Sequence, residues 1–309
     1  MKQKLLLSVV ISAFNEEKKI EDCLKSASFA DEIIFVDNGS TDRTREIASK
    51  YTSKIFIRAN KLMLNINKNF GFSKAKGEWV FSLDADERIS EYLQKEIVDL
   101  TKHSGRTPQL NGYFIPRKNI IFGKWIKHTG WYPDNQLRLF KKGKGKFPEE
   151  HVHEMIKVEG NAGHLNQSIV HYNYETIFQF MQKLVNIYAP NEAEQLLKNG
   201  YKFNWQDSIR FPIKEFLSRF FVREGYKDGF HGLMLSILMA FYHFMVFATI
   251  WEKYHFKEIG DKNILSETQA EFKSFYKEIL FWFNIEKIKS INNPVKKFIY
   301  YLLSKLQLL

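Results

Sequence analysis

The N-terminal part of the chain alternates between short apolar runs and amphipathic segments. Apolar segments of strand length cover residues 6–12, 32–36, 54–58 and 79–83. Uninterrupted apolar runs of this length are typical of strands that are buried on both faces of a parallel sheet. Apolar residues recur at helical spacing over residues 20–27, 47–51, 66–75 and 93–100. This alternation of strands and helices predicts an α/β unit built on a parallel sheet.

The boundaries of these segments carry their own signals. Asn15 and Ser90 precede two of the helical segments and are expected to cap them. The basic start at Met1–Lys4 and the apolar run after it resemble a secretion signal. The run continues into Asn15 and Glu16 without a small-residue cleavage site, so we interpret it as the first strand.

The pattern changes to long helices from residue 175 onward. Residues 175–200 predict a helix kinked near Pro190, and residues 209–221 carry an apolar stripe flanked by basic side chains: Arg210, Lys214, Arg219 and Arg223. A basic amphipathic helix of this kind is typical of a membrane interface. A last apolar stripe, also with lysines beside it, follows Pro294. We therefore expect an α/β domain over residues 1–174 and a helical, membrane-associating region over residues 175–309.

The uncharged segment 232–251 bears on how that region meets a membrane. It contains no Asp, Glu, Lys or Arg and, as a helix, is long enough to cross a bilayer core. Its polar residues Ser236, Tyr242, His243 and Thr249 make it a poor spanning segment. We favour an interfacial helix over a buried packing helix, and both over a true span.

Composition narrows the choice of partners. The chain has 309 residues and a formal net charge of +11, which indicates an anionic partner such as nucleic acid, anionic lipid or a phosphorylated substrate. Helix-turn-helix, zinc-finger and RNP signatures are absent from the sequence, so we do not expect a nucleic-acid partner. The one cysteine, Cys23, allows no intramolecular disulfide, which fits a reducing cytoplasm.

Three predicted strands end in polar segments, at residues 13–16, 37–40 and 84–86. The carboxyl ends of parallel strands meet at one edge of a sheet, where ligands bind. The Gly-x-Gly-x-x-Gly and phosphate-loop motifs are absent, and acids stand where those motifs place glycines. Asp84 and Asp86 repel each other unless a cation joins them, and Mg²⁺ or Mn²⁺ holding a diphosphate meets that need. The alternative to a metal site is that Asp84 and Asp86 simply lie in a solvated turn.

The same segments resemble the inverting glycosyltransferases of family 2, which have the GT-A fold. The resemblance covers residues 5–100 and rests on Ser8–Glu17 (SVVISAFNEE), Phe35–Asp42 (FVDNGSTD) and the Asp-x-Asp. A looser resemblance extends through Trp131–Phe140 (WYPDNQLRLF) and His151–Glu154 (HVHE). Those two segments are similar to a subgroup that adds glucose or a related sugar to the inner core of lipopolysaccharide.

The resemblance implies roles for the residues at the strand ends. Asp37 would contact the uracil of a UDP-sugar, Asp84 the ribose or the water shell of the metal, and Asp86 would ligate Mg²⁺ or Mn²⁺. The set expected around the nucleotide is completed by Ala13, Asn15, Glu16, Asn69 and Arg138. For Asn69 the alternative is an ordinary helix start, and for Arg138 it is a solvated strand face.

Inversion requires a base on the acceptor side to remove the proton of the attacking hydroxyl. Glu154 is our first candidate because the subgroup motif ends in His-Glu. Asp134 is the second candidate, and Glu149 and Glu150 come last, because a solvated loop also explains them. A competing interpretation is a Zn²⁺ site made by alternate histidines with a further ligand: His151, His153 and either Glu154 or His171.

Together these observations predict a metal-dependent glycosyltransferase that is peripheral on the cytoplasmic face of the inner membrane. It would move a sugar, glucose first among the choices, from a UDP-sugar to a lipid-linked saccharide, with lipopolysaccharide inner core as the expected acceptor. The alternative within the class is a polyprenyl-linked or capsular saccharide. Charge alone suggests a different class, a basic nucleic-acid-binding protein.

Overall fold

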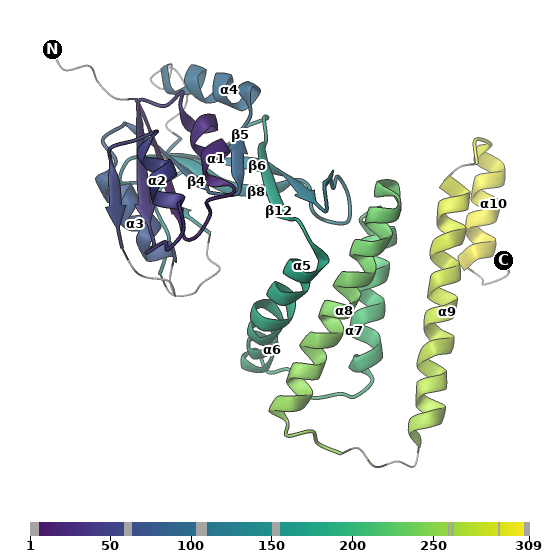
Figure 1. The fold of residues 1–309 in the computed structure, drawn as a ribbon. Coiled ribbons are helices and arrows are strands. Elements are labelled where there is room, and N and C mark those ends of the chain that lie inside the picture. The colour runs from purple at the N-terminus through teal and green to yellow at the C-terminus, as the bar shows by residue number, and fades with distance from the viewer. Residues whose placement is uncertain are drawn as a thin grey trace. The chain divides into compact units, whose positions relative to one another are not determined.

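The computed structural model describes residues 6–58, 64–102, 110–149, 155–258, 260, 263–289 and 291–305. The chain divides into two compact units (Figure 1). The first unit comprises residues 1–127 and 131–175 and holds the sheet. The second comprises residues 128–130 and 176–309 and is helical.

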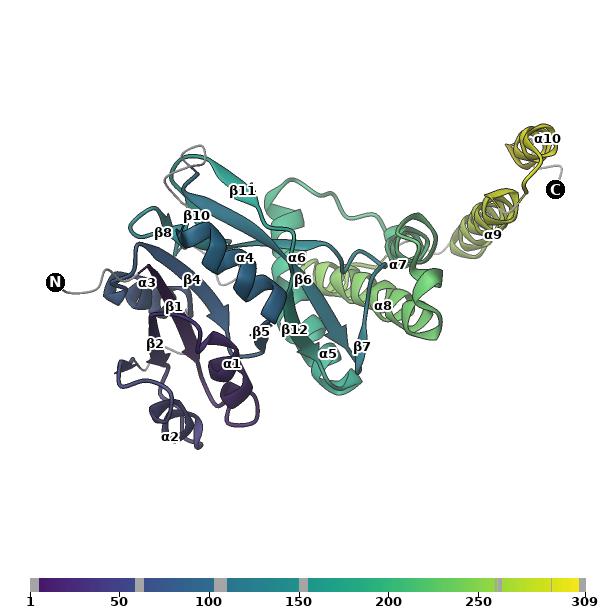
Figure 2. The same ribbon diagram turned by 90° about the horizontal axis from the view of Figure 1, so that it is seen from above.

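The N-terminal half of the sheet is parallel, as the sequence predicts. Its strands are β1 (Leu7–Ala13), β2 (Glu32–Asp37), β3 (Ile55–Ile57) and β4 (Trp79–Asp84), in the order β3-β2-β1-β4. Figure 2 shows β1 between β2 and β4. Every residue of β1 and β2 is buried. The helices of this half are α1 (Ile20–Ala27), α2 (Thr44–Ser49), α3 (Leu64–Lys74) and α4 (Glu91–Lys102). The continuous apolar runs therefore reflect burial on both faces.

The other half of the sheet is mixed and continues the order as β4-β8-β6-β12-β5. Its strands are β5 (Glu87–Ile89), β6 (Gly112–Ile121), β8 (Asp134–Lys141) and β12 (Ile169–Tyr174). The strand β8 lies antiparallel between β4 and β6. Short β7 (Lys124–Trp125) and β11 (Ala162–His164) also pair with β6, and β9 (Gly145–Lys146) pairs with β10 (Lys157–Val158) in a separate ladder.

Two apolar clusters cover the two faces of the sheet. One contains Leu24 of α1 and Ile97 of α4, packed with alternate residues of the central strands such as Ile11. The other contains Phe72 of α3, together with Val10. A Cβ atom on Gly71 would lie 2.4 Å from Cγ1 of Val10, so a glycine allows α3 to approach β1 this closely.

The two predicted helix caps have different outcomes. Ser90 caps α4, since its hydroxyl accepts a hydrogen bond from the backbone N–H of Leu93 at 3.3 Å. The prediction for Asn15 is wrong, because α1 begins at Ile20, after a turn, and the N-cap position is Lys19. Asn15 has φ of 54° and binds the loop after β2 instead. Asparagine tolerates this left-handed conformation better than most residues.

The second unit contains α5 (Ile177–Lys183), α6 (Ala189–Lys198), α7 (Asp207–Leu217), α8 (Phe230–Lys253), α9 (Ile264–Lys289) and α10 (Pro294–Lys305). A five-residue π-helical stretch, Leu184–Tyr188, joins α5 to α6 just before Pro190. The helix predicted over residues 175–200 is therefore α-helix, π-helix and α-helix in succession. Proline has no N–H to donate and its ring crowds the preceding turn, which explains the departure from α geometry there.

The uncharged segment forms α8, which packs beside α7 and α6 (Figure 1). Among the described helices, α8 is the one whose length and hydropathy would suffice to cross a membrane. One side of it is buried, including Leu235, Val246 and Ile250, whereas Ile237 and Phe241 are exposed. The helix thus packs within its own unit and also presents apolar side chains at the surface.

The basic stripe predicted beside α7 is partly neutralised by ion pairs. The guanidinium group of Arg210 binds the carboxylate of Glu271 in α9. Arg219 binds Glu215 at 2.6 Å and donates to the backbone oxygen of Thr129 at 2.8 Å. Sequence periodicity finds the stripe but does not reveal these partners, one of which comes from a different helix.

Candidate active site

The sheet register brings the three polar strand ends together. Ala13 is paired with Asp37 across β1 and β2, and Ser12 is paired with Asp84 across β1 and β4. The backbone N–H of Asn38 donates to the backbone oxygen of Ala13 at 2.9 Å. The ends of β1, β2 and β4 therefore form one continuous edge.

The loops that follow β1 and β2 are bonded to each other. The side-chain oxygen of Asn15 accepts a hydrogen bond from the backbone N–H of Thr41 at 2.8 Å. The backbone N–H groups of Asn15 and Glu16 donate to the hydroxyls of Ser40 and Thr44, at 3.1 and 2.7 Å. Asn15 and Glu16 thus hold the two loops in a fixed relation at the edge of the sheet.

Asp37 and Asn38 are fully buried beneath these loops and keep hydrogen-bonding capacity. Asp37 Oδ1 accepts a hydrogen bond from the backbone N–H of Ser40 at 3.1 Å, and Oδ2 lies 3.3 Å from Nε of Arg45. Neither Asp37 Oδ2 nor Asn38 Nδ2 has a hydrogen-bond partner among the described residues. Buried polar atoms without partners are costly, so their presence at a strand edge points to a ligand that binds them.

Asp84 lies between two cations. Its Oδ1 is 2.5 Å from Nζ of Lys68 in α3, and its Oδ2 is 2.7 Å from Nη2 of Arg138 in β8. Burial alone would raise the pKa of Asp84, but Arg138 and Lys68 outweigh it and hold the pKa well below its usual value. Arg138 also binds Glu87 at 2.7 Å, and only 5% of its surface is exposed. The alternative of a solvated strand face for Arg138 is therefore wrong.

Asp86 follows β4 in the turn before β5, and its Oδ2 lies 3.5 Å from Nε2 of His171 in β12. Burial raises the pKa of Asp86, but the interaction with His171 outweighs it, so the pKa lies below its usual value. His171 Nδ1 lies 2.7 Å from the side-chain oxygen of Asn119. Nε2 of His171 is therefore directed at the Asp86 carboxylate while Nδ1 is held by an amide.

Asn119 determines how the His171 ring is used. Its amide nitrogen donates to the backbone oxygen of Trp131 at 2.7 Å and to Asp134 at 3.2 Å, so its oxygen faces His171. An amide oxygen only accepts, and Nδ1 of His171 must therefore carry a proton in this network. When the ring is neutral, the lone pair of Nε2 faces the Asp86 carboxylate. A carboxylate oxygen and an imidazole nitrogen directed at each other form a chemically suitable pair of ligands for a divalent cation.

Asp134 begins β8 and belongs to the same network. It accepts hydrogen bonds from Arg117 at 2.5 and 2.9 Å and from Gln136 at 2.9 Å. Burial raises its pKa, but Arg117 and the amide donors outweigh it, so the pKa is lowered. Arg117 also contacts Glu87 at 3.2 Å. Asp134 is thus connected to the strand-end acids through Arg117 and, by way of Asn119, to His171.

The remaining candidates are placed differently or lie outside the description. Glu150, His151, His153 and Glu154 fall outside the described residues. Asn69 donates to the backbone oxygen of Phe147 at 2.9 Å and to Glu149 at 2.6 Å, so these residues bind each other. Among the described residues, no group of three His, Cys, Asp or Glu side chains has the arrangement of a metal site.

Sequence reasoning missed three residues of this cluster: Glu87, Arg117 and Asn119. Two signals were available. Glu87 directly follows the Asp-x-Asp, and Arg117 and Asn119 occupy alternate positions of one strand, which places them on one face. Nothing in the local pattern indicated that this strand would contribute to the edge formed by β1, β2 and β4.

Comparison with known proteins identifies the family of this chain. The family model described as glycosyl transferase family 2 matches residues 8–160. A lipopolysaccharide core biosynthesis glycosyltransferase of Rhizobium meliloti (strain 1021), LpsC, is 28% identical, over 82% of this chain and 95% of its own length. An uncharacterized glycosyltransferase of Rickettsia typhi (strain ATCC VR-144 / Wilmington), RT0209, is 30% identical, over 80% of this chain and 87% of its own length.

Among solved structures, the chain resembles S. aureus TarS 1–349 in complex with UDP-GlcNAc. The TM-score is 0.42 and the sequence identity 16%, over 81% of this chain and 92% of that one. The two sequence relatives show higher identity, 28% and 30%, over most of this chain and most of each relative. The chain therefore belongs to glycosyl transferase family 2, and the mixed sheet of its first unit is the GT-A fold expected of that family.

Proposed function

We propose that this glycosyltransferase moves a sugar, glucose first among the candidates, from a UDP-sugar to a lipid-linked saccharide, in an inverting and metal-dependent reaction. The observation that carries the proposal is the strand-end cluster. It combines buried acceptors and donors that lack partners, two cations beside Asp84, and a carboxylate–imidazole pair at Asp86. A nucleoside diphosphate sugar presents the matching groups, namely a base, a ribose and a diphosphate.

The donor would be bound by residues of three strand ends. The unpartnered atoms of Asp37 and Asn38 suit the hydrogen-bonding edge of uracil, and Asp84 suits the ribose hydroxyls. Lys68 and Arg138 would then face the diphosphate, whose charge they offset. In this proposal Ala13, Asn15 and Glu16 form the rim of the nucleotide site through the bonded loops described above.

Asp86 and His171 would hold the divalent metal, Mg²⁺ or Mn²⁺. The support is the direction of Nε2 toward the carboxylate and the hydrogen bond that fixes Nδ1. When bound, the metal would neutralise the charge that develops on the departing UDP. The support for a metal here is the chemical type of the two ligand atoms, a carboxylate oxygen and an imidazole nitrogen. The remaining ligands would come from the diphosphate and water.

Two carboxylates remain candidates for the base. Glu154 keeps first place on the resemblance of His151–Glu154 to the subgroup motif. Asp134 lies in the described cluster, but the donors around it lower its pKa, which makes it a weaker proton acceptor. Binding of an acceptor near Arg117 would change that environment. The lowered pKa of Asp134 therefore supports the order Glu154 before Asp134.

Lipopolysaccharide inner core is the acceptor we propose, supported by the printed name of the Rhizobium meliloti relative. A polyprenyl-linked or capsular saccharide is the alternative. We also propose that the protein is peripheral on the cytoplasmic face of the inner membrane and contacts anionic lipid through α10. That helix exposes Val295 and Phe298, and its lysines Lys296 and Lys297 form no ion pair with other described residues.

The donor assignment is tested by calorimetry and by a hydrolysis screen. UDP should bind the full chain more tightly with Mn²⁺ or Mg²⁺ than with EDTA, and one UDP-sugar of a panel should be hydrolysed in a metal-dependent way. Metal-independent UDP binding together with no hydrolysis of any UDP-sugar would contradict the proposal.

The membrane assignment is tested with anionic vesicles at low salt. Because each basic residue near such a surface contributes about 1 kcal/mol, the double variant Lys296→Gln/Lys297→Gln should bind about 30-fold more weakly. Lys273→Gln/Lys277→Gln in α9 is the matched control, since it removes the same charge from an exposed helix that also carries acids. Equal binding by the two variants would show that α10 is not the contact.

A further inference from the structure

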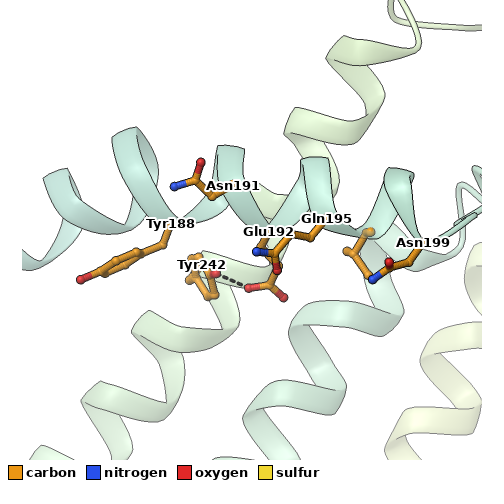
Figure 3. A pocket seen from close by; sticks show the side chains of 7 residues that line it. Tyr188, Asn191, Glu192, Gln195, Asn199 and Tyr242 are labelled. Carbon is orange, nitrogen blue, oxygen red and sulfur yellow. Dashed lines mark hydrogen bonds between the residues drawn. The ribbon is translucent and has the colours of Figure 1, made fainter. Parts of the chain in front are cut away.

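A second potential binding site lies in the helical unit and shares no residue with the strand-end cluster. It is a cavity of about 420 Å³ between α6 and α8 (Figure 3). The lining comprises Tyr188, Asn191, Glu192, Gln195, Leu196, Asn199 and Tyr242. Pockets for small molecules commonly measure about 300–1,000 Å³, so this volume suits a small ligand.

The lining chemistry is unlike that of the rest of the chain. The chain contains 46 Lys and Arg residues, yet none of the described residues that line this cavity is Lys, Arg or His. Glu192 supplies a negative charge and Leu196 is the one aliphatic side chain of the lining. A phosphate, a nucleotide or an anionic headgroup would meet no cation here, and a purely apolar ligand would meet few apolar groups.

Three side-chain amides stand along one side of α6, at Asn191, Gln195 and Asn199, which are spaced four residues apart. In the part of the chain that the structure describes, these amides form no hydrogen bonds with protein groups. Each amide offers two N–H donors and an acceptor oxygen. A hydroxyl both donates and accepts, so a ligand with several hydroxyls would use such a row fully.

Part of the site is already held in place. The hydroxyl of Tyr242 donates to Oε2 of Glu192, as the dashed line in Figure 3 shows. Only 7% of Tyr242 is exposed. Burial raises the pKa of Tyr242, and the neighbouring Glu192 raises it further, so the hydroxyl remains a donor at neutral pH. The partly exposed ring of Tyr188 adds a flat apolar surface that suits the C–H face of a sugar ring.

From this combination we propose that the cavity between α6 and α8 is a saccharide-binding subsite for an uncharged, hydroxyl-rich sugar unit. It is a binding site and not a catalytic one. The proposal goes beyond the proposed function, since it depends on residues of the helical unit alone. The lining combines a row of amides, a fixed Tyr–Glu pair and the aromatic face of Tyr188, and it contains no cationic side chain.

Binding of saccharides to the full chain, without donor or metal, tests the subsite. The probes are the neutral sugars maltose, cellobiose and lactose, and their binding is measured by calorimetry and saturation-transfer NMR. At least one probe should bind saturably at millimolar concentration. Asn191→Ala/Gln195→Ala should weaken that binding about tenfold, because two hydrogen bonds contribute on that order. Gln182→Ala, an exposed amide of α5 outside the lining, should leave it unchanged.

The possible results separate the alternatives. No saturable binding of any probe, or equal binding by the double variant, overturns the subsite. Loss of saccharide binding in Asp86→Ala but not in the double variant would place the sugar at the strand ends instead, and also overturns it. Loss of binding in Glu192→Gln with the double variant unaffected would mean that the carboxylate of Glu192 binds the sugar without the row of amides, and also overturns the subsite. Metal-dependent UDP binding should be the same in the double variant and the wild type, which keeps this test separate from that of the proposed function.

Discussion

Both edges of the same sheet bury carboxylates beside basic groups, but they do so in different ways. At the amino ends of the parallel strands, Glu32 accepts hydrogen bonds from the Ser8 hydroxyl, the Lys54 ammonium and the backbone N–H of Lys76. At the carboxyl ends, Asp37, Asn38 and Arg138 keep buried polar atoms without hydrogen-bond partners among the described residues. Burial of a charge is common to both edges, but the charged groups with incomplete hydrogen bonding, Asp37 and Arg138, lie at the carboxyl edge.

This difference separates a structural use of charge from a functional one. A buried carboxylate with a full set of donors stabilises the fold once it is formed. A buried polar atom without a partner costs free energy in the isolated protein, and a ligand recovers that cost on binding. The carboxyl edge is therefore the place to look for substrate, and the amino edge supplies internal controls.

The largest effect should come from removing the proposed metal ligand at the carboxyl edge. Asp86→Ala should lower transfer by more than about 100-fold, because even the outer partners of metal ligands contribute about 10–100-fold. The fold should survive, since Asp86 lies in a turn after β4 and not in the core. Calorimetry with UDP and Mn²⁺ measures the loss directly, with Asp22→Ala on α1 as the surface control. Unchanged metal-dependent UDP affinity in Asp86→Ala would contradict the assignment of Asp86 as a metal ligand.

Replacing the proposed general base should have the second-largest effect on sugar transfer. Glu154→Gln should bind UDP and metal normally but transfer sugar about 100-fold more slowly, the usual contribution of a general base. Asp134→Asn should have a smaller effect, because its hydrogen bonds to Arg117, Asn119 and Gln136 already lower its proton affinity. Single-turnover rates compare the two variants. If Asp134→Asn is inactive and Glu154→Gln is active, the two roles are exchanged.

Asn119 sharpens the comparison because its side chain connects His171 to Asp134 at the carboxyl edge. Asn119→Ala should weaken Mn²⁺ affinity about 10-fold or more, since His171 loses the acceptor that orients its ring. Asn119→Asp should restore much of that affinity, as a carboxylate also accepts from Nδ1–H. Manganese titration followed by electron paramagnetic resonance gives both values without any turnover. Failure of Asn119→Asp to recover more affinity than Asn119→Ala would argue for a purely structural Asn119.

The smallest effect, and the matched contrast, is expected at the amino edge. Glu32→Gln should cost on the order of 1 kcal/mol of unfolding free energy at pH 7 and leave UDP and metal affinity unchanged. Burial raises the pKa of Glu32, but Lys54, Ser8 and Lys76 outweigh it, so the folded pKa lies below the unfolded value. The stabilisation from Glu32 is therefore present above about pH 4.3 and is lost as the pH falls through the folded pKa.

Urea unfolding at a series of pH values measures this contribution. The difference in unfolding free energy between wild type and Glu32→Gln should narrow below about pH 4.3. A difference that stays constant with pH would mean that the charge of Glu32 is not the source of the stabilisation. Weaker UDP binding in Glu32→Gln would instead mean that the amino edge also contributes to substrate binding.

The sequence by itself determined the parallel half of the sheet and the position of its functional edge. Runs such as Val9–Ile11 and Ile33–Val36 report burial on both faces through local periodicity, and polar residues mark where each strand stops. The Asp84–Asp86 pair and the family resemblance follow from short segments read in order. Helical periodicity likewise located the stripe on α7 and the apolar segment of α8.

Only the tertiary structure decided which distant residues complete the edge. Lys68, Arg138, His171 and Asn119 come from four different elements, and the order β4-β8-β6-β12 brings three of those elements to one place. The same holds for Arg210, whose partner Glu271 is sixty-one residues away and removes its charge from the predicted basic stripe. Local patterns record which residues are buried, because burial repeats with the period of the helix or strand. Which buried residue meets which other depends on strand order and register, and those are properties of the packed chain as a whole.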